Sequence, residues 1–237
     1  ALLARLDLLD PDHTSPLDAE ARPARVLVGG AGQLTEAIAA SIRSATGADV
    51  RSGEAALGDT VHELREALSE RVPPALIPEL VVLPAPAGVD PARGDPWLTH
   101  GVAHLAVVVE GGQATVGPLV GPPLLGDEPC LRCVELARCG WDDTRAAVLA
   151  QAAPRQDPIL APPVRAEPVL AELVCGLTTV VVAGALRGEP LPPGVTVEAS
   201  AAWPRMDHRR WVRHPGCGHA VVTPRHTDAS VRVTMAG

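Results

Sequence analysis

The sequence predicts an α/β fold in which helices flank a mostly parallel sheet. Short apolar runs such as RVLV at 25–28 and LVVLPA at 80–85 are typical of buried strands. Between them, Leu34, Ile38 and Ile42 recur every four residues, which places all three on one face of a helix. A glycine-rich turn joins the first strand to this helix. Alternation of strand and helix of this kind builds a parallel sheet.

The elements follow in a regular order along the first half of the chain. The first helix runs to Gly47, a strand follows at 48–53, and a second helix is expected over 60–70. Strands are then expected at 78–86, 104–109 and 114–120, the last two joined by the Gly111–Gly112 hairpin. This hairpin is antiparallel and is predicted near the edge of the sheet.

The second half is predicted to be helical and then to return to β structure. Helices are expected over 133–143, 146–158 and 168–187, and strands within 194–219. The apolar run 169–186 contains Glu172 and two glycines, so a buried helix is favoured over a membrane span. Residues 1–22 are interpreted as the tail of an upstream peptide-binding module plus a linker, and residues 23–237 as one domain.

Composition narrows the classes of partner and compartment. The net charge of -8 argues against nucleic acid, because binding phosphate requires a basic surplus. All 20 basic residues are arginine, and the aromatic residues are four Trp with no Phe or Tyr. The chain opens without the basic start and cleavage site of a secretory signal. With five cysteines a full disulfide framework is not expected, and a cytoplasmic location is predicted.

The glycine turn carries Gly29, Gly30 and Gly32 between a strand and a helix. Such a turn can point backbone N–H groups at a phosphate. However, Thr35 stands where the third glycine of the dinucleotide fingerprint belongs, and neither Val50 nor Arg51 is the acid that would hold a ribose. A tight turn within the sheet is therefore favoured over a nucleotide site, and ATP is not expected as a cofactor.

Cys130 and Cys133 form a C-x-x-C pair at the start of a helix, which fits a redox pair, half of a metal site or two small apolar residues. Cys217 and His219 form a second close pair on a glycine-flanked turn. Four N/S ligands are what a structural zinc ion requires, so a closed zinc site that pins the C-terminal β segment is predicted. His214 is a rival ligand with a more natural role in the turn. Cys139 and Cys175 stay unassigned.

Segments 104–138 and 211–219, which contain GPLV, PCLRC and HPGCG, resemble the ThiF/E1-like proteins of ribosomal peptide natural-product clusters. These cyclodehydratase-associated proteins bind the leader of a precursor peptide and accompany YcaO enzymes. The resemblance spans about residues 23–220 and implies a Rossmann-like E1 fold whose two cysteine pairs hold structural zinc. His219 stands where the family has its fourth cysteine.

Relative to adenylating members of that family, the chain lacks lysine, and Leu83 and Pro84 occupy the place of the magnesium-binding acid. The resemblance therefore implies a partner protein with no catalytic residues or independent activity. It would present a precursor peptide to a YcaO-type cyclodehydratase, by strand addition at 114–120 or at the basic stretch 205–213. An ATP-dependent adenylyltransferase and an architectural, zinc-stabilised homodimer are the alternatives. No membrane partner is expected.

Overall fold

The computed structural model describes residues 22–70, 77–121, 128–152, 163–201 and 205–218. The predicted N-terminal tail and linker lie outside these ranges except for Arg22. The elements in chain order are β1 (Arg25–Val28), α1 (Gln33–Thr46), β2 (Asp49–Ser52), α2 (Glu54–Glu70), β3 (Leu80–Ala85), a 3-10 turn η4 (Pro91–Arg93), α3 (Asp95–Thr99), β4 (Ala103–Glu110), β5 (Gln113–Val120), α4 (Leu131–Cys139), α5 (Arg145–Ala152), α6 (Pro168–Leu186), β6 (Val195–Ser200) and β7 (Arg205–Arg210).

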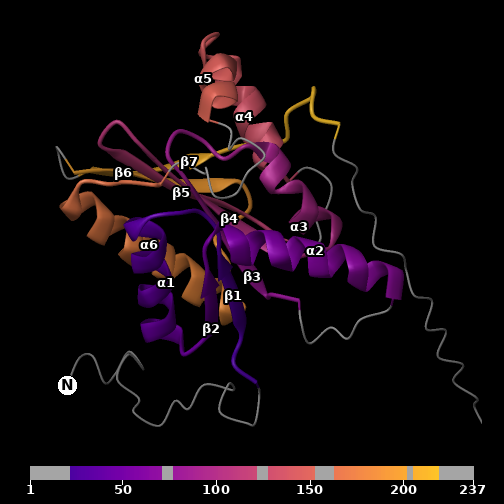
Figure 1. Cartoon of the computed structure of the whole chain (residues 1–237). Coiled ribbons are helices and arrows are strands. Elements are labelled where there is room, and N and C mark those ends of the chain that lie inside the picture. Colours follow the sequence, from indigo (N-terminus) through magenta and orange to yellow (C-terminus); the bar gives the residue numbers. More distant parts are fainter. Residues whose placement is uncertain (1–21, 71–76, 122–127, 153–162, 202–204, 219–237) are drawn as a thin grey trace, which may run out of the picture.

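The strands form one seven-stranded sheet of order β2-β1-β3-β4-β5-β6-β7 (Figure 1). The first four strands in this order pair in parallel, which confirms the α/β prediction for the first half of the chain. From β4 onward every pair is antiparallel. The sheet is thus divided into a parallel half and an antiparallel half that meet at β4.

The predicted position of the β4–β5 hairpin is wrong, because two more strands continue the sheet beyond it. β5 pairs with β6 through Gln113 to Val116, and β6 pairs with β7 over its full length. Five of the last six residues of β5 are buried, so its surface is covered and its hydrogen-bonding edge is already occupied. Among the described residues, β7 is therefore the outer strand at this end of the sheet.

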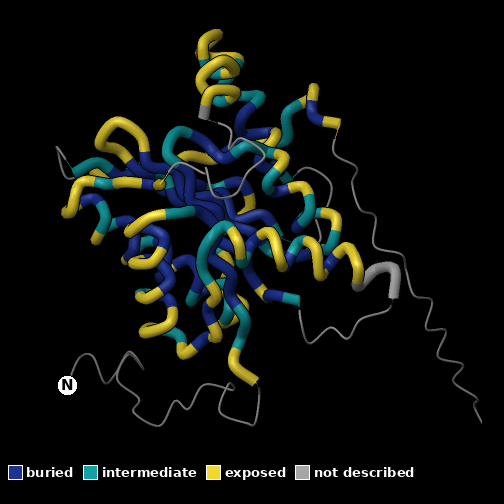
Figure 2. The backbone as a smooth tube through the Cα atoms, viewed as in Figure 1, coloured by how far each residue is buried: buried dark blue, intermediate teal, exposed yellow. Residues whose placement is uncertain are grey.

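Two apolar layers enclose the central strands. One layer joins α1 and α6 to one face of the sheet, with Ile38, Ile42, Leu170 and Val174 among its buried side chains. The other contains residues of α2, α3 and α4, including Leu64, Trp97 and Leu131. Figure 2 shows the burial concentrated in the strands and on the inner sides of these helices.

Helix α6 has the length and composition of a helix able to cross a membrane, with a mean hydropathy of 2.1. It packs against α1 and β5, and its eight buried residues include Val174, Thr178 and Val182. This packing fits the buried helix expected from the sequence.

Candidate functional site

Three of the four predicted metal ligands converge at one end of α4. Cys130 is the residue before the helix, and Cys133 lies in its first turn, where its N–H donates to the Cys130 carbonyl at 3.0 Å. Cys217 comes from the segment after β7, held by a turn in which its N–H donates to the His214 carbonyl at 2.9 Å. All three side chains are buried. His219, the fourth predicted ligand, lies outside the described residues.

The spacing of the sulfurs suits a tetrahedral metal ion. The three Sγ atoms lie within 4.8 Å of one another, with 3.7 Å between Cys130 and Cys217 and 3.9 Å between Cys130 and Cys133. Ligands at about 2.3 Å from a tetrahedral zinc ion are about 3.8 Å apart. The three cysteines can therefore hold a metal ion.

Electrostatics at this cluster also favour a cation. Burial, together with the neighbouring Cys133 and Cys217, raises the pKa of the Cys130 thiol to about 12. Three adjacent thiolates would repel one another in this apolar surrounding, and a bound divalent cation removes that cost. The three cysteines belong to the second apolar layer, together with Trp97, Val102 and Leu131, so the cluster is part of the core.

His214 takes the turn role that the sequence favoured. Its Nδ1 accepts a hydrogen bond from the Gly216 N–H at 3.1 Å, and its carbonyl accepts from Cys217. Cys175 is buried in α6 on the other side of the sheet and Cys139 lies at the end of α4, so neither joins the cluster.

The glycine turn between β1 and α1 has structural reasons for its glycines. Gly30 and Gly32 have φ values of 94° and 99°, which side chains rarely tolerate. A Cβ on Gly32 would come within 2.9 Å of Pro163, and the Val164 N–H donates to the Ala31 carbonyl at 2.9 Å. The segment that leads to α6 therefore packs directly against the turn.

A charged pair stands beside this turn. The Arg93 guanidinium lies next to Gly29 and donates to Glu54 Oε1 at 2.6 Å, with only 16% and 12% of the two side chains exposed. Glu54 follows β2 by two residues, a position the sequence interpretation missed because it looked for the acid at Val50 and Arg51. Glu54 therefore neutralises the charge of the guanidinium that lies beside Gly29.

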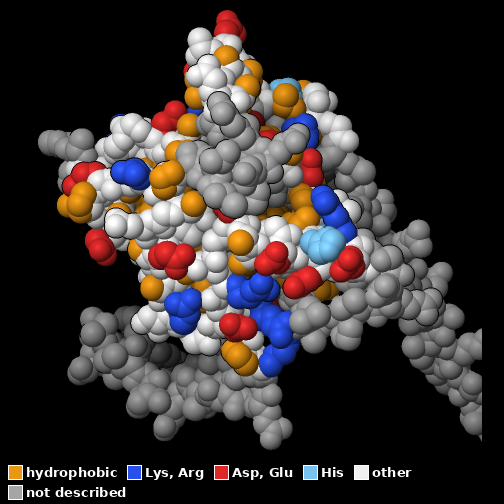
Figure 3. All heavy atoms as spheres, in the orientation of Figure 1, with side chains coloured by type: hydrophobic (Ala, Val, Ile, Leu, Met, Phe, Trp, Pro, Cys, Tyr) orange, Lys and Arg blue, Asp and Glu red, His pale blue; other side chains and the backbone are white. Residues whose placement is uncertain are grey.

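On the face that Figure 3 shows, acidic and basic side chains are interspersed. On this face the described side chains form no extended basic patch. This agrees with the net charge of -8.

Comparison with solved structures finds a similar fold in two heterocyclase structures and in E. coli MccB. The chain matches the structure of a heterocyclase in complex with substrate and cofactor (TM-score 0.57, 17% identity), over 84% of this chain and 25% of that one. It matches the heterocyclase TruD (0.55, 18%) over 83% and 27%, and E. coli MccB with selenomethionine MccA (0.52, 15%) over 82% and 66%. The chain thus spans about a quarter of the heterocyclases. No protein-family model and no curated protein sequence matches it.

Proposed function

We propose that this chain is an E1/ThiF-like, non-catalytic partner in the maturation of a ribosomally made peptide. It binds the precursor peptide and docks a YcaO-type cyclodehydratase, which forms azoline rings from Cys, Ser or Thr side chains. The observation that carries the proposal is the convergence of Cys130, Cys133 and Cys217, since the motifs PCLRC and HPGCG carry the resemblance to that family. The fold shared with part of two heterocyclases supports it.

In this proposal the cysteine cluster holds structural zinc with His219 as the fourth ligand. Zinc at four protein ligands has no free position for water and supplies a cross-link between distant segments. The ligands Cys130 and Cys133 fix the start of α4, and Cys217 fixes the segment that follows β7. Their role is to hold the antiparallel half of the sheet against α4.

The glycine turn supports a non-catalytic role. An adenylating enzyme needs cations for the ATP phosphates and an acid for magnesium. Here the nearest guanidinium is paired with Glu54, and β3 ends with Leu83, Pro84 and Ala85 in place of an acid. ATP binding is therefore not part of the proposed function.

The antiparallel half supplies the peptide contact. Residues Gln113–Val116 of β5 are paired on both sides, so this part of the first expected contact strand has no free edge for strand addition. β7 is the outer strand, and five of its six residues are exposed. Main-chain hydrogen bonds from an incoming peptide to the free edge of such a strand are a common mode of recognition.

The direct test is binding of candidate precursors. Each short peptide encoded beside the gene is synthesised with a fluorescein label, and fluorescence anisotropy is recorded against the full chain. Saturable binding of one peptide, unaffected by ATP, is the expected result. If none of the peptides binds the zinc-loaded chain, the proposal is wrong.

An ATP-dependent adenylyltransferase is the alternative that one observation favours. Glu54 lies at the carboxyl end of β2, where dinucleotide-binding folds place the acid that holds a ribose. This alternative requires ATP–pyrophosphate exchange in the presence of the bound peptide. Exchange that disappears in Glu54→Gln would replace the non-catalytic proposal.

The architectural homodimer remains the other alternative. Helix α6 exposes Val169 and Val180, at 65% and 70%, on the side away from its core contacts. Light scattering distinguishes this alternative, since a dimer that binds no precursor peptide would favour it.

A further inference from the structure

A groove lies on the face of the antiparallel half opposite α6, beneath α4 and α5. Its accessible volume is about 520 Å³. It is lined by strand residues, by the ends of the two helices and by Trp211 just after β7. The lining residues include Thr115, Arg138, Trp141, Arg145, Glu198 and Arg209. A pocket of this size takes several residues of an extended chain.

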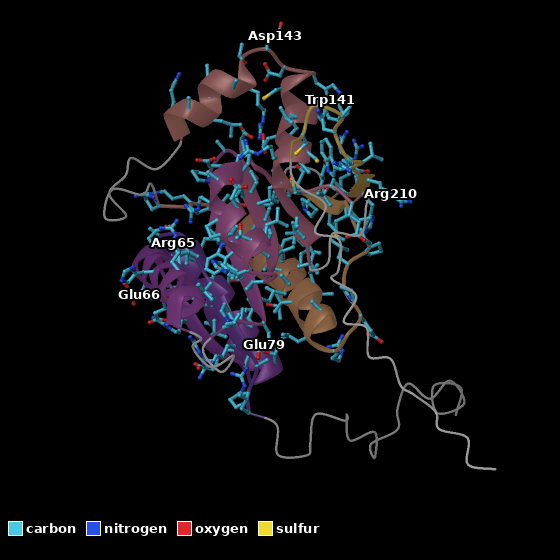
Figure 4. The ribbon with its side chains drawn as sticks, turned by 90° about the vertical axis from the view of Figure 1, so that its right-hand side faces the viewer. Arg65, Glu66, Glu79, Trp141, Asp143 and Arg210 are labelled. Carbon is cyan, nitrogen blue, oxygen red and sulfur yellow. The ribbon has the colours of Figure 1, made fainter. Side chains whose placement is uncertain are left out.

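Two stacked tryptophans form one wall of the groove. The ring centroids of Trp141 and Trp211 are 5.3 Å apart at an interplanar angle of 26°. Trp211 is buried and its indole N–H donates to Thr196 Oγ1, whereas Trp141 is 66% exposed. Figure 4 labels Trp141 on the same side of the molecule as Arg210 of β7. An exposed indole held in place by a buried one is a preformed apolar platform.

Arginines surround the tryptophans. The guanidinium of Arg138 lies 5.4 Å from the Trp211 ring centroid, and that of Arg209 lies 5.3 Å and 5.5 Å from Trp141 and Trp211. Such cation–π contacts fix the direction in which the N–H groups point. Trp and Arg are also the residues that most often dominate the energy of protein interfaces.

Arg138 has hydrogen-bond donors to spare. Its side chain is only 16% exposed, and its nearest charge partner, Glu135 Oε1, is 3.7 Å away, which is beyond hydrogen-bond distance. Glu135 instead accepts from Arg145 at 3.0 Å. Within the described ranges Arg138 donates no hydrogen bond, so an acceptor from a ligand would satisfy a nearly buried guanidinium.

The charges of the groove nevertheless balance. Arg145 is paired with Glu110 and Glu135, and Arg209 donates to Glu198 at 2.6 Å. Three arginines and three carboxylates line the space, so it carries no surplus for a phosphate or a nucleotide. An uncharged ligand with carbonyl oxygens for Arg138 and an apolar group for Trp141 fits this combination. A peptide main chain with an apolar side chain has both.

The groove also reaches β7, the outer strand of the sheet among the described residues. Thr115 pairs with Glu198, and Thr196 pairs with Arg209, so Thr115, Glu198 and Arg209 lie on the same face of β5, β6 and β7. The opposite face, with Val116, Val197 and Ala199, is buried, Val116 in the apolar layer with α6. A peptide in the groove can therefore continue along β7.

We infer that the groove between Trp141, Arg138 and β7 is the binding site for an uncharged, extended segment of the precursor peptide, with an apolar side chain on Trp141 and a main-chain carbonyl on Arg138. The inference rests on the proposed function, which leaves the site of the peptide open. It also links the groove to the cysteine cluster. Helix α4 carries Cys133 in its first turn and Arg138 in its last. The segment that follows β7 carries both Trp211 and Cys217.

The test compares variants with the labelled peptide that binds most tightly to the wild-type full chain. Trp141→Ala and Arg138→Gln are expected to weaken binding at least about tenfold, and Trp141→Phe less than Trp141→Ala. Val180→Ala and Arg187→Gln, both exposed in or next to α6, are the matched controls and keep wild-type affinity. Circular dichroism and zinc content confirm that each variant is folded.

Each outcome has a separate meaning. If no peptide binds the wild type, the proposed function itself fails. If a peptide binds and both groove variants keep wild-type affinity, the site assignment is overturned while the proposed function stands. Affinity should change less than about threefold between low and high salt, because no net charge is neutralised. A fall in affinity of more than about tenfold at high salt would overturn the inference that the bound segment is uncharged. So would an alanine scan of the peptide in which an acidic residue contributes most to binding.

Discussion

The two halves of the sheet differ in what covers them. The parallel half, β2-β1-β3-β4, is enclosed by helices on both faces, and all six residues of β3 are buried. The antiparallel half has α6 on one face and the groove on the other, and it ends in the exposed strand β7. The glycine turn between β1 and α1 therefore lies in the parallel half, whose strands are covered on both faces. The groove and Cys217 belong to the antiparallel half, which has exposed surface available to a partner.

The largest expected effect comes from removing a ligand of the cysteine cluster that holds the antiparallel half against α4. In Cys133→Ser the zinc content should fall from about one per chain to near zero, and the free energy of unfolding should fall by about 4 kcal/mol or more, because loss of a metal releases two distant segments. Metal content by atomic emission and denaturant unfolding are the measurements.

Cys139→Ser is the matched control, since Cys139 lies on the same helix but outside the cluster. It should keep its zinc and lose little stability. A wild-type chain that is well folded without any metal would contradict the zinc proposal. Equal zinc content in the two variants would contradict it as well.

The next effect compares one side chain from each half. Ile38 is fully buried between α1 and the sheet, so Ile38→Ala should cost about 3 kcal/mol. Met206 on β7 is 51% exposed, and Met206→Ala should change stability by less than about 0.5 kcal/mol. Urea denaturation measures both. Similar losses would mean that β7 is covered in solution, for example by a second copy of the chain.

The buried His104 of β4 makes the free energy of unfolding depend on pH. Burial lowers the pKa of His104 from 6.5 to about 4, and its Nδ1 lies 3.2 Å from the Val102 carbonyl. As the pH falls, the unfolded chain takes up a proton on His104 before the folded chain does. The contribution of His104 to the free energy of unfolding is therefore complete above about pH 6.5 and is lost as the pH falls toward 4. The loss is about 3 kcal/mol.

Unfolding of the wild type and of His104→Asn across this pH range isolates the effect. The asparagine amide can still donate to the Val102 carbonyl but does not titrate. The stability difference between the two proteins should therefore change between pH 6.5 and 4. A constant difference would show that His104 is hydrated in the folded protein.

The smallest expected effect concerns the pair beside the glycine turn. A double-mutant cycle of Glu54→Gln and Arg93→Gln should give a coupling of about 2 kcal/mol, because the pair is nearly buried and hydrogen-bonded at 2.6 Å. A coupling near zero would leave Arg93 free for an anion. That result would reopen the nucleotide alternative.

Much of the fold follows from local patterns. The strands of the parallel half and helices α1, α4 and α6 lie close to where periodicity and glycine place them. Helix α2 begins at Glu54, earlier than the predicted start at residue 60. Gly58, Asp59 and Thr60 are residue types typical of a helix start, so the local sequence favours the later position. The burial of Leu57 against the sheet, seven residues before Leu64, keeps the helix intact through Gly58.

The sequence by itself pointed to the three cysteines that the structure brings together, since a C-x-x-C pair and a glycine-flanked cysteine are local signals. The fourth predicted ligand, His219, stays a prediction. The sequence also determined which strands are apolar enough to be buried. Only the tertiary structure decided that β5 is interior and β7 is the edge, that Pro163 packs on the glycine turn, and that Trp141 meets Trp211. The reason is physical: these features join residues tens of positions apart, and such pairings depend on how the sheet and helices pack, which no local period encodes.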